Sequence, residues 1–319
     1  MPKVIALTGA TGFVGAELAR QLAVAGYSIQ ALIRQASTWK RPANLAVKWI
    51  EGDLENLDSL RRLVDGATAV VHCAGAVRGA TREQFNRVNV DGLARLVHAA
   101  AAQQPAPRLL LISSLAAREP HLSHYAASKR LGEKVLVENS HRLPWTIYRP
   151  CAIYGPGDKE MRPVFEWMAK GVAPILGSGK NRFSLLYVKD MAEAIVHWLN
   201  GNCCVADIFE LHDGYPGGYS WHDVVNTFQH LRTKSVISIK IPLVLVRLVS
   251  GLNLIASRAF GYAPMLTPGK VRELSHSDWV CDNAALSSAT GWAPRVFLPE
   301  GLQKTLGRKL TTKNQGGME

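Results

Sequence analysis

Short apolar runs, many of them β-branched, alternate with amphipathic stretches through the first 150 residues. These runs predict six strands, at Val4–Leu7, Ser28–Ile33, Val47–Ile50, Ala69–His72, Leu109–Ile112 and Thr146–Tyr148. Between the first two runs, Ala16–Ala25 has a helical pattern that Gly26 ends. Strands that alternate with helices and carry continuous apolar residues are typical of a buried parallel sheet. The predicted fold class is therefore α/β, with a doubly wound parallel sheet.

The composition excludes several classes of protein. Of the 319 residues, 47% are hydrophobic, which supports a large core and excludes intrinsic disorder. No run reaches about 18 uncharged apolar residues, and the chain starts without the pattern of a signal peptide, so we expect a cytoplasmic protein. The cysteines are few and form no C-x-x-C pair, so we expect reduced thiols and no metal site. They are Cys73, Cys151, Cys203, Cys204 and Cys281.

Charge is the unusual feature of the composition. There are 37 Lys and Arg residues against 25 Asp and Glu, which gives a net charge of +12. Such an excess fits nucleic acid, an anionic membrane surface or phosphate-bearing ligands, and a soluble basic protein without such a partner is the alternative. The chain has no helix-turn-helix pattern, no zinc-finger pattern and no basic stretch with interleaved aromatic residues. We therefore expect no nucleic-acid partner.

A glycine-rich loop follows the first strand. Thr8-Gly9-Ala10-Thr11-Gly12-Phe13-Val14-Gly15 has the G-x-x-G-x-x-G spacing and opens a helix. This spacing lets the backbone turn tightly and approach a pyrophosphate, which the helix N-terminus then holds. A merely structural tight turn is the alternative. The loop predicts a dinucleotide site of the Rossmann type, with Gly9, Thr11, Gly12, Phe13, Val14 and Gly15 as cofactor-binding residues.

The end of the second strand indicates which dinucleotide is bound. An acidic residue there would accept hydrogen bonds from the ribose of NAD, whereas this strand ends in Ile33-Arg34-Gln35. A guanidinium suits a 2′-phosphate, so Arg34 favours NADP(H) over NAD(H), and a solvated surface arginine is the alternative. Asp53 and Leu54 follow the third strand, where Asp53 could reach the adenine amino group.

Three residues carry the predicted chemistry. The fifth strand ends in Ser113-Ser114, and Tyr125 and Lys129 follow, four residues apart on one helix face. A free tyrosine has a pKa of about 10, so it needs a cation to stabilise its phenolate. Lys129 would supply that cation, and Ser114 would hydrogen-bond the substrate oxygen. We expect Ser114, Tyr125 and Lys129 to be the catalytic residues.

Together these motifs resemble the extended short-chain dehydrogenase/reductase family, from residue 3 to about residue 306. Further matches are Ala74 and Gly75 after the fourth strand, Asn89-Val90-Asp91-Gly92, Arg149-Pro150, Tyr154–Gly157, Tyr187–Asp190, Asp282 and Gly291-Trp292-x-Pro294. The resemblance implies that Ala74 and Gly75 bind cofactor, that Asn89 is a structural support and that Lys129 also holds the nicotinamide ribose. Nucleotide-sugar enzymes of this family often have Val-Tyr-Gly where this chain has Leu115–Ala117. The sequence is more similar to the branch of 3β-hydroxysteroid dehydrogenases, dihydroflavonol reductases and bacterial ceramide-pathway reductases.

The distal part of the chain has two features of interest. Val236–Phe260 is almost wholly apolar, and Lys240, Arg247 and Arg258 share one face if the segment is one helix with Pro242 near its start. It could lie in an anionic membrane interface, or it could be an ordinary helix over the substrate cleft. Either way we expect an apolar substrate wall, to which Met265, Leu266 and Trp279 contribute. Arg182 matches a position where sugar-acting relatives contact phosphate, and hairpin anchoring is the alternative for it.

The predicted organisation follows from these motifs. The NADP-binding domain consists of residues 1–150 and about 183–212, and the second part includes a helix at Asp190–Leu199. A smaller, discontinuous substrate region consists of residues about 151–182, with a helix at Val164–Lys170, and residues 213–310. The last residues, 311–319, form a flexible tail. The expected function is reversible conversion of a ketone and a secondary alcohol on a hydrophobic lipid-like molecule, a keto-sphingoid, keto-ceramide or steroid-like compound. The alternatives are a nucleotide-sugar epimerase or dehydratase and a non-catalytic cofactor-binding subunit. The oligomeric state, monomer or homodimer, stays open.

Overall fold

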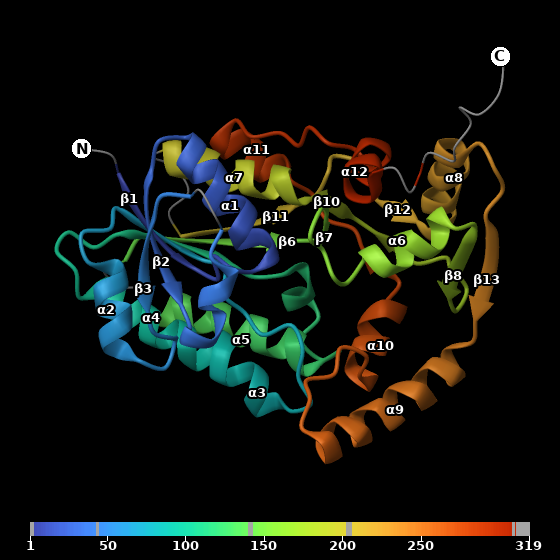
Figure 1. Ribbon diagram of the computed structural model, residues 1–319, viewed down its shortest axis with the longest axis horizontal. Helices are drawn as coiled ribbons and strands as arrows, with labels where there is room; N and C mark the ends of the chain where they lie inside the picture. Colours follow the sequence, from blue (N-terminus) through green and yellow to red (C-terminus); the bar gives the residue numbers. More distant parts are fainter. Residues whose placement is uncertain (1–2, 43–44, 140–142, 202–205, 308–309, 311–319) are drawn as a thin grey trace.

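In the computed structural model, which describes residues 3–42, 45–139, 143–201, 206–307 and 310, seven parallel strands form the central sheet (Figure 1). Their order across the sheet is β11-β6-β5-β4-β1-β2-β3. The strands are β1 (Val4–Thr8), β2 (Ser28–Ile33), β3 (Val47–Glu51), β4 (Ala69–His72), β5 (Arg108–Ile112), β6 (Trp145–Pro150) and β11 (Asp207–Leu211). All six predicted strands are present, with ends that differ by at most two residues, and the predicted α/β fold class is confirmed. Cys203, Cys204 and 311–319 lie outside the described residues.

The strand order sets where a ligand can bind. The chain leaves β1 toward β2 and β3 on one side and then returns to place β4 on the other side of β1. The direction in which the chain adds strands across the sheet therefore reverses between β1 and β4, although all the strands stay parallel. Ligands of open α/β sheets bind outside the carboxyl ends of the strands at such a point. The Gly9–Gly15 loop begins there, directly after β1.

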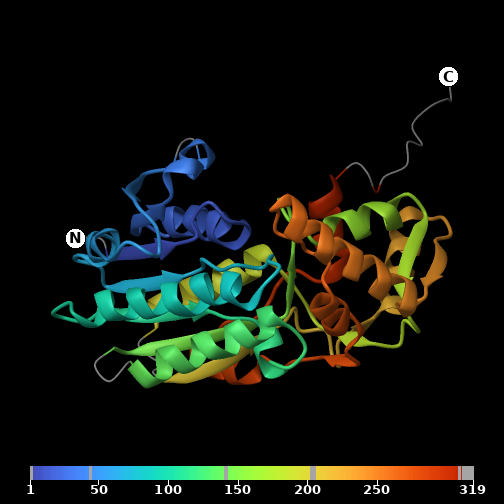
Figure 2. The same ribbon diagram turned by 90° about the horizontal axis from the view of Figure 1, so that it is seen from below.

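Helices cover both faces of the sheet, as Figures 1 and 2 show. On one face lie α1 (Phe13–Val24), α7 (Val188–Asn200) and α11 (Ala284–Thr290), and their core includes Leu18, Leu22, Ile195 and Leu286. On the other face lie α2 (Leu57–Val64), α4 (Leu93–Ala101) and α5 (His124–Asn139), with Leu60, Leu96 and Leu136 in the core. Shorter helical elements are η1 (Gln35–Lys40), α3 (Arg82–Asn86), a π-helical turn η2 (Arg87–Gly92) and η3 (Leu115–Arg118).

A smaller lobe lies beside the carboxyl ends of the sheet strands and has its own apolar core (Figure 2). Its strands form three small sheets, β7 (Ala152–Tyr154) with β10 (Leu185–Tyr187), β8 (Val172–Leu176) with β13 (Ile237–Ile241), and β9 (Arg182–Phe183) with β12 (Tyr219–Ser220) and β14 (Asp278–Trp279). Its helices are α6 (Arg162–Ala169), α8 (Trp221–Arg232), α9 (Leu243–Phe260), α10 (Pro268–Ser275) and α12 (Leu298–Leu306). The lobe is built from segments separated in sequence, because α7 and β11 belong to the central sheet layers.

The prediction that Pro242 lies at a helix start is confirmed, but the condition that Val236–Phe260 is helical throughout does not hold. Ile237–Ile241 is the strand β13, which pairs in parallel with β8, and Pro242 is the N-cap of α9. Proline fixes its own φ and has no N–H for a ladder, so it ends the strand and suits a helix start. Lys240 therefore lies in a strand and shares no helix face with Arg247 and Arg258.

Candidate active site

The glycine loop after β1 is shaped by close backbone contacts. Gly9 has a φ of +73°, and a Cβ there would lie 2.7 Å from the backbone nitrogen of Ala74. A Cβ at Gly15 would lie 2.1 Å from the carbonyl oxygen of Gly9. Only glycine fits at these two positions, because a Cβ cannot occupy the space at either, and residues with a side chain rarely adopt the φ of Gly9. The loop thus brings the start of α1 close to the segment that follows β4.

The N-terminus of α1 fits the phosphates of a dinucleotide. The helix begins at Phe13 with Gly12 as its N-cap, and among the described residues no side chain caps it. Its first turn carries no acidic residue. The first N–H groups of a helix have no partner within the helix and carry a partial positive charge. Thr11, Phe13 and Val14 lie at this helix N-terminus, so the predicted cofactor-binding residues fit a pyrophosphate.

Three of the predicted cofactor residues lie at the ends of β2 and β3. Arg34 is exposed at the carboxyl end of β2. Asp53 shapes the turn after β3, where its Oδ1 accepts hydrogen bonds from the backbone N–H groups of Glu55 and Asn56, at 2.8 and 3.1 Å. Leu54 packs against Gly92, where a Cβ would lie 2.9 Å from the Leu54 Cβ. The contact of Asp53 with adenine stays a prediction.

The segment after β4 is tied to β1 by a buried histidine. His72 Nδ1 and Thr8 Oγ1 are hydrogen-bonded at 2.8 Å, and the Ala74 N–H donates to the same hydroxyl at 3.2 Å. Burial, and then the charge of Lys129, lowers the pKa of His72 to about 3. His72 is therefore neutral near pH 7 and fixes the geometry of the loop that contains Gly75. A Cβ at Gly75 would lie 3.2 Å from Lys129 Nζ.

The structure brings the predicted catalytic residues together at the carboxyl end of β5. Ser114 caps η3 by accepting a hydrogen bond from the Ala116 N–H, at 3.2 Å, and its hydroxyl is also hydrogen-bonded to Tyr125. Tyr125 lies in the first turn of α5, and Lys129 follows one turn later. Lys129 Nζ donates to the carbonyl of Ile112 at 3.0 Å.

Burial sets the protonation of this group. It raises the pKa of Tyr125 to about 12, which the bond to Ser114 partly offsets and the negative charge of Glu273 increases. Burial also lowers the pKa of Lys129 to about 8, against the opposite effect of Glu133. At neutral pH the protein thus holds a protonated phenol near a cationic ammonium group. This arrangement suits a proton donor whose phenolate is stabilised when the proton leaves.

Asn89 supports the helix that carries Tyr125 and Lys129. It lies in the π-helical turn η2, and its Nδ2 donates to Ser128 Oγ at 2.9 Å and to the Ala76 carbonyl at 3.0 Å. Its Oδ1 accepts from the Ala76 N–H at 2.8 Å. A Cβ at Gly132 would lie 2.4 Å from the Asn89 carbonyl oxygen, so α5 packs closely on this turn. These contacts agree with a structural role.

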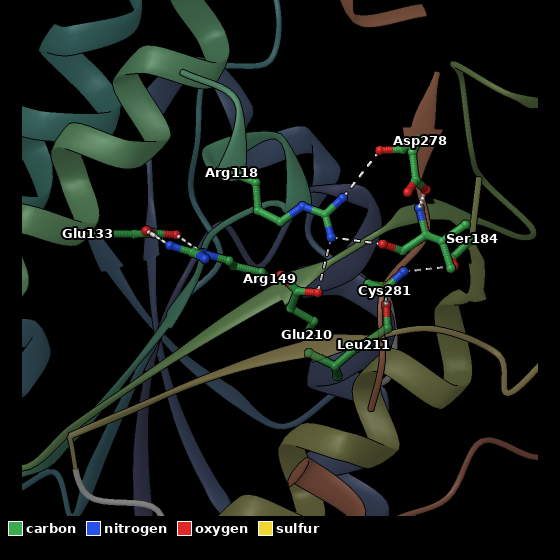
Figure 3. Close-up of polar contacts among 9 residues, drawn as sticks. Arg118, Glu133, Arg149, Ser184, Glu210, Leu211, Asp278 and Cys281 are labelled. Atoms are coloured by element: carbon green, nitrogen blue, oxygen red, sulfur yellow. Dashed lines mark hydrogen bonds and ion pairs between the residues drawn. The ribbon is translucent and has the colours of Figure 1, made fainter. Parts of the chain in front are cut away.

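A buried ion pair behind the catalytic residues was missed by the sequence analysis. Arg149 donates from Nε and Nη2 to Glu133, at 2.8 and 2.6 Å (Figure 3). Ser113 Oγ also donates to Glu133 Oε1, at 2.6 Å. Glu133 is one turn beyond Lys129 on α5, while Arg149 is on β6. The helical spacing Lys129–Glu133 was the available signal, but the partner on β6 is defined only by the fold.

Arg118 connects the two lobes next to the site. Figure 3 shows its guanidinium directed toward the backbone of β14 and toward Glu210 on β11. It donates to the carbonyls of Val280 and Asp278 at 2.8 and 3.3 Å, and it lies 3.5 Å from Glu210 Oε2. Because Arg118 ends η3, which begins one residue after Ser114, this contact joins the position of Ser114 to the smaller lobe.

A pocket of about 130 Å³ opens beside Tyr125 at the junction of the two lobes. Apolar side chains from both lobes line it, and they are Val77, Ala80, Phe85, Leu254, Pro264 and Met265. Polar residues at the same pocket are Ser123, His124, Arg258, Lys270, Arg272 and Glu273. The predicted apolar wall is thus present in part. Trp279 instead donates from Nε1 to the Glu273 carbonyl at 2.8 Å, and the Leu266 carbonyl accepts from Asn253 at 2.8 Å.

Glu273 is a buried acidic residue of this pocket, and no local sequence pattern predicts its position there. Lys270 Nζ is 2.9 Å from its Oε2, and Ser123 Oγ donates to its Oε1. Arg182, by contrast, lies away from this cluster. Its Nη2 donates to the carbonyls of Gly217 and Gly218, so it anchors a turn of the smaller lobe, as the alternative reading of this residue proposed.

Comparison with known proteins agrees with this class of site. The model of the NAD dependent epimerase/dehydratase family matches residues 5–203, and the chain therefore belongs to this family. Its members and relatives are NAD(P)-dependent dehydrogenases, reductases and epimerases, and this chain is an enzyme of that class.

Individual relatives include both reductases and an epimerase. The chain is 37% identical over 305 residues to a ceramide reductase of Caulobacter vibrioides, covering 95% of this chain and 93% of the relative. It is 28% identical to a 2-alkyl-3-oxoalkanoate reductase of Stenotrophomonas maltophilia, covering 66% and 71%. The structure of a UDP-glucuronic acid 4-epimerase from Bacillus cereus with NAD has a TM-score of 0.74 at 18% identity, covering 99% and 98%. This last likeness shows the fold alone.

Proposed function

We propose that the protein is an NADP(H)-dependent oxidoreductase that interconverts a ketone and a secondary alcohol on a hydrophobic lipid-like molecule of the keto-sphingoid or keto-ceramide class. The observation that carries the proposal is that Tyr125, hydrogen-bonded to Ser114, lines the same pocket as Phe85, Leu254 and Met265. The likeness to a ceramide reductase supports a lipid ketone as the substrate.

The residues of the chain have separate tasks in the reductive direction. A dinucleotide held on the Gly9–Gly15 loop would supply the hydride that reduces the carbonyl carbon. Tyr125 donates its phenolic proton to the carbonyl oxygen, which Ser114 holds by a hydrogen bond. The ammonium of Lys129 stabilises the phenolate that remains. In the oxidative direction Tyr125 accepts the proton, so the same group serves both directions.

Arg34 is the basis for preferring NADP(H) to NAD(H). It is exposed at the end of β2, and the sequence has no acidic residue between it and Glu51. A guanidinium forms strong charge-assisted hydrogen bonds with a phosphate group, whereas it gives no such advantage with a ribose hydroxyl.

A nucleotide-sugar epimerase is the second candidate, which the family favours. Sugar nucleotides carry a pyrophosphate, and a cationic side chain of the substrate lobe would have to bind it. Arg182, which the sequence analysis considered for this task, is hydrogen-bonded to the carbonyls of Gly217 and Gly218. Arg182 is therefore engaged elsewhere, but Arg258, Lys270 and Arg272 also line the pocket, so the feature that favours the reductase is the apolar part of the lining.

The test is a comparison of substrates with the purified full-length protein. With an N-acyl 3-keto-sphingoid base in detergent, the protein should consume NADPH and reduce the ketone to the secondary alcohol, which mass spectrometry identifies. Tyr125→Phe should reduce the rate by about 10²–10⁴-fold, as expected for loss of a general acid. Tyr215→Phe, a matched change at an exposed tyrosine outside the pocket, should not.

Three outcomes would contradict the proposal. Epimerisation of a UDP-sugar without net NADPH consumption would make the protein an epimerase. Full activity in Tyr125→Phe would remove the proposed proton donor. Tight NADPH binding without turnover of any ketone or sugar nucleotide would support a non-catalytic, cofactor-binding subunit.

A further inference from the structure

We propose that α9 docks the protein on an anionic lipid bilayer and lies in the plane of the interface. The outer face of this helix is apolar and exposed. Val244, Leu248, Leu252 and Ile255 are 75%, 60%, 59% and 66% exposed, although apolar side chains of this size are usually buried. Leu245, Val249 and Phe260 extend the same exposed surface. A contiguous apolar patch of this kind marks an interaction surface.

The orientation of α9 is the reverse of that of an ordinary surface helix. The side chains of α9 that are fully buried are those of Ser250 and Ser257, which both bond to carbonyls of their own helix. They lie seven residues apart on the face that packs on the protein. A surface helix normally directs its apolar face to the core and its polar face to solvent. In Figures 1 and 2, α9 lies at the edge of the smaller lobe, with α10 beside it.

Charge around the patch indicates the kind of partner. Residues 224–272 contain no aspartate or glutamate, and within this segment α9 carries two arginines, Arg247 and Arg258. Arg247 and Arg258 are eleven residues apart on α9, which is close to three full turns, so both lie along one border of the apolar face. Both are exposed. Apolar side chains flanked by arginines match the acyl region and the anionic headgroups of a bilayer surface.

The same charge disfavours a second copy of this chain as the partner. Two α9 helices that met through their apolar faces would bring their bordering arginines and the acid-free segment 224–272 close together. Like charges at an interface repel, and no acidic residue of this segment is present to compensate. The bilayer is therefore the occupant that we assign to this face.

The helix α9 is held along the surface of the protein at its start and in its second half. By length and composition α9 could cross a membrane, which the search for uncharged runs missed because Arg247 and Arg258 interrupt it. However, it follows β13, which is paired with β8, and Asn253 in its second half donates from Nδ2 to the Leu266 carbonyl. Spanning would require the loss of these contacts. Lying in the interface keeps them and immerses only the outer face.

Docking would also place the pocket next to the lipid. Leu254 and Arg258, on the inner side of α9 and at its border, line the same pocket as Tyr125. A lipid substrate would then have a short path from the bilayer to the site. The docking itself rests on the exposed face and the charge, and it stands whether or not the proposed reaction is correct.

The test is flotation of the full-length protein with vesicles. Vesicles of phosphatidylcholine with about 30% phosphatidylglycerol should carry the protein upward, and pure phosphatidylcholine should carry much less, as expected for an interfacial helix that also uses charge. Leu248→Glu combined with Leu252→Glu should weaken binding to the anionic vesicles by about tenfold or more. Val24→Glu, a change at a 91% exposed valine on α1, is the matched control and should float like the unaltered protein.

Two further measurements make each outcome decisive. NADPH binding, followed by protein fluorescence, should be equal in all variants, which shows that they are folded and separates this test from that of the proposed reaction. Light scattering after gel filtration gives the oligomeric state. Absence of flotation with anionic vesicles, or equal flotation of the double variant, would overturn the proposal. If the unaltered protein is a dimer, only the double variant is a monomer, and flotation does not change, the apolar face of α9 would be assigned to a second copy of the chain.

Discussion

The carboxylate of Glu273 and the phenol of Tyr125 line the same pocket, and the negative charge of Glu273 adds to the effect of burial in raising the pKa of Tyr125. The two residues come from different lobes, since Glu273 is on α10 and Tyr125 is on α5. The smaller lobe therefore contributes to the electrostatics of the catalytic group as well as to the wall of the pocket.

Glu273→Gln should lower the pKa of Tyr125. Removal of a nearby negative charge makes the phenolate easier to form, and oxidation of the alcohol requires Tyr125 to accept a proton. The pH of half-maximal alcohol oxidation should therefore fall. The measurement is the pH dependence of kcat in the oxidative direction. Glu300→Gln, a change on α12 away from the pocket, is the control. A profile of Glu273→Gln that coincides with the unaltered protein would contradict the coupling.

How much of this site the sequence could predict depends on the range of the contacts. The strands, the glycine loop and the Tyr125–Lys129 pair are local patterns, so periodicity and spacing predicted them. Glu273 approaches Tyr125 only because the smaller lobe folds over the sheet, and no local pattern records that contact. The strand at Ile237–Ile241 was not predicted for a related reason, because its partner β8 is more than 60 residues earlier in the chain.

Arg34→Ala should raise the KM for NADPH by about tenfold to 100-fold, which corresponds to the loss of hydrogen bonds between charged groups. The KM for NADH should change less than about twofold, because NADH has no 2′-phosphate. Steady-state kinetics with both cofactors measures this difference. Arg20→Ala, at an exposed arginine on α1, is the matched control. An unchanged preference for NADPH over NADH would leave the assignment of Arg34 without support.

His72 should make the fold sensitive to acid. Its pKa is about 3 in the folded protein and about 6.5 in an unfolded chain, so below pH 6.5 the unfolded chain binds the proton more readily. The contribution of His72 to stability is therefore complete above pH 6.5 and is lost as the pH falls toward 3, at up to about 1.4 kcal/mol per pH unit.

His72→Gln should reduce this dependence, because the glutamine amide is polar but does not titrate. Chemical denaturation between about pH 6 and pH 4 gives the free energy of unfolding and its slope with pH. His121→Gln, at a side chain that is 72% exposed, should keep the slope of the unaltered protein. Equal slopes for His72→Gln and His121→Gln would contradict the assignment.

Gly15→Ala should damage the cofactor site and the fold together. A Cβ at Gly15 would lie 2.1 Å from the Gly9 carbonyl oxygen, so the loop or the start of α1 would have to move. NADPH binding should weaken by about tenfold or more, because the N–H groups that face the phosphates move with the loop. The melting temperature should also fall, by several degrees.

Gly251→Ala is the matched control, since Gly251 is also in a helix but has open space around it. Alanine there should stabilise the fold by about 0.5–1 kcal/mol. Fluorescence titration with NADPH and thermal unfolding measure both effects, and unchanged NADPH affinity in Gly15→Ala would show that the cofactor does not bind on this loop.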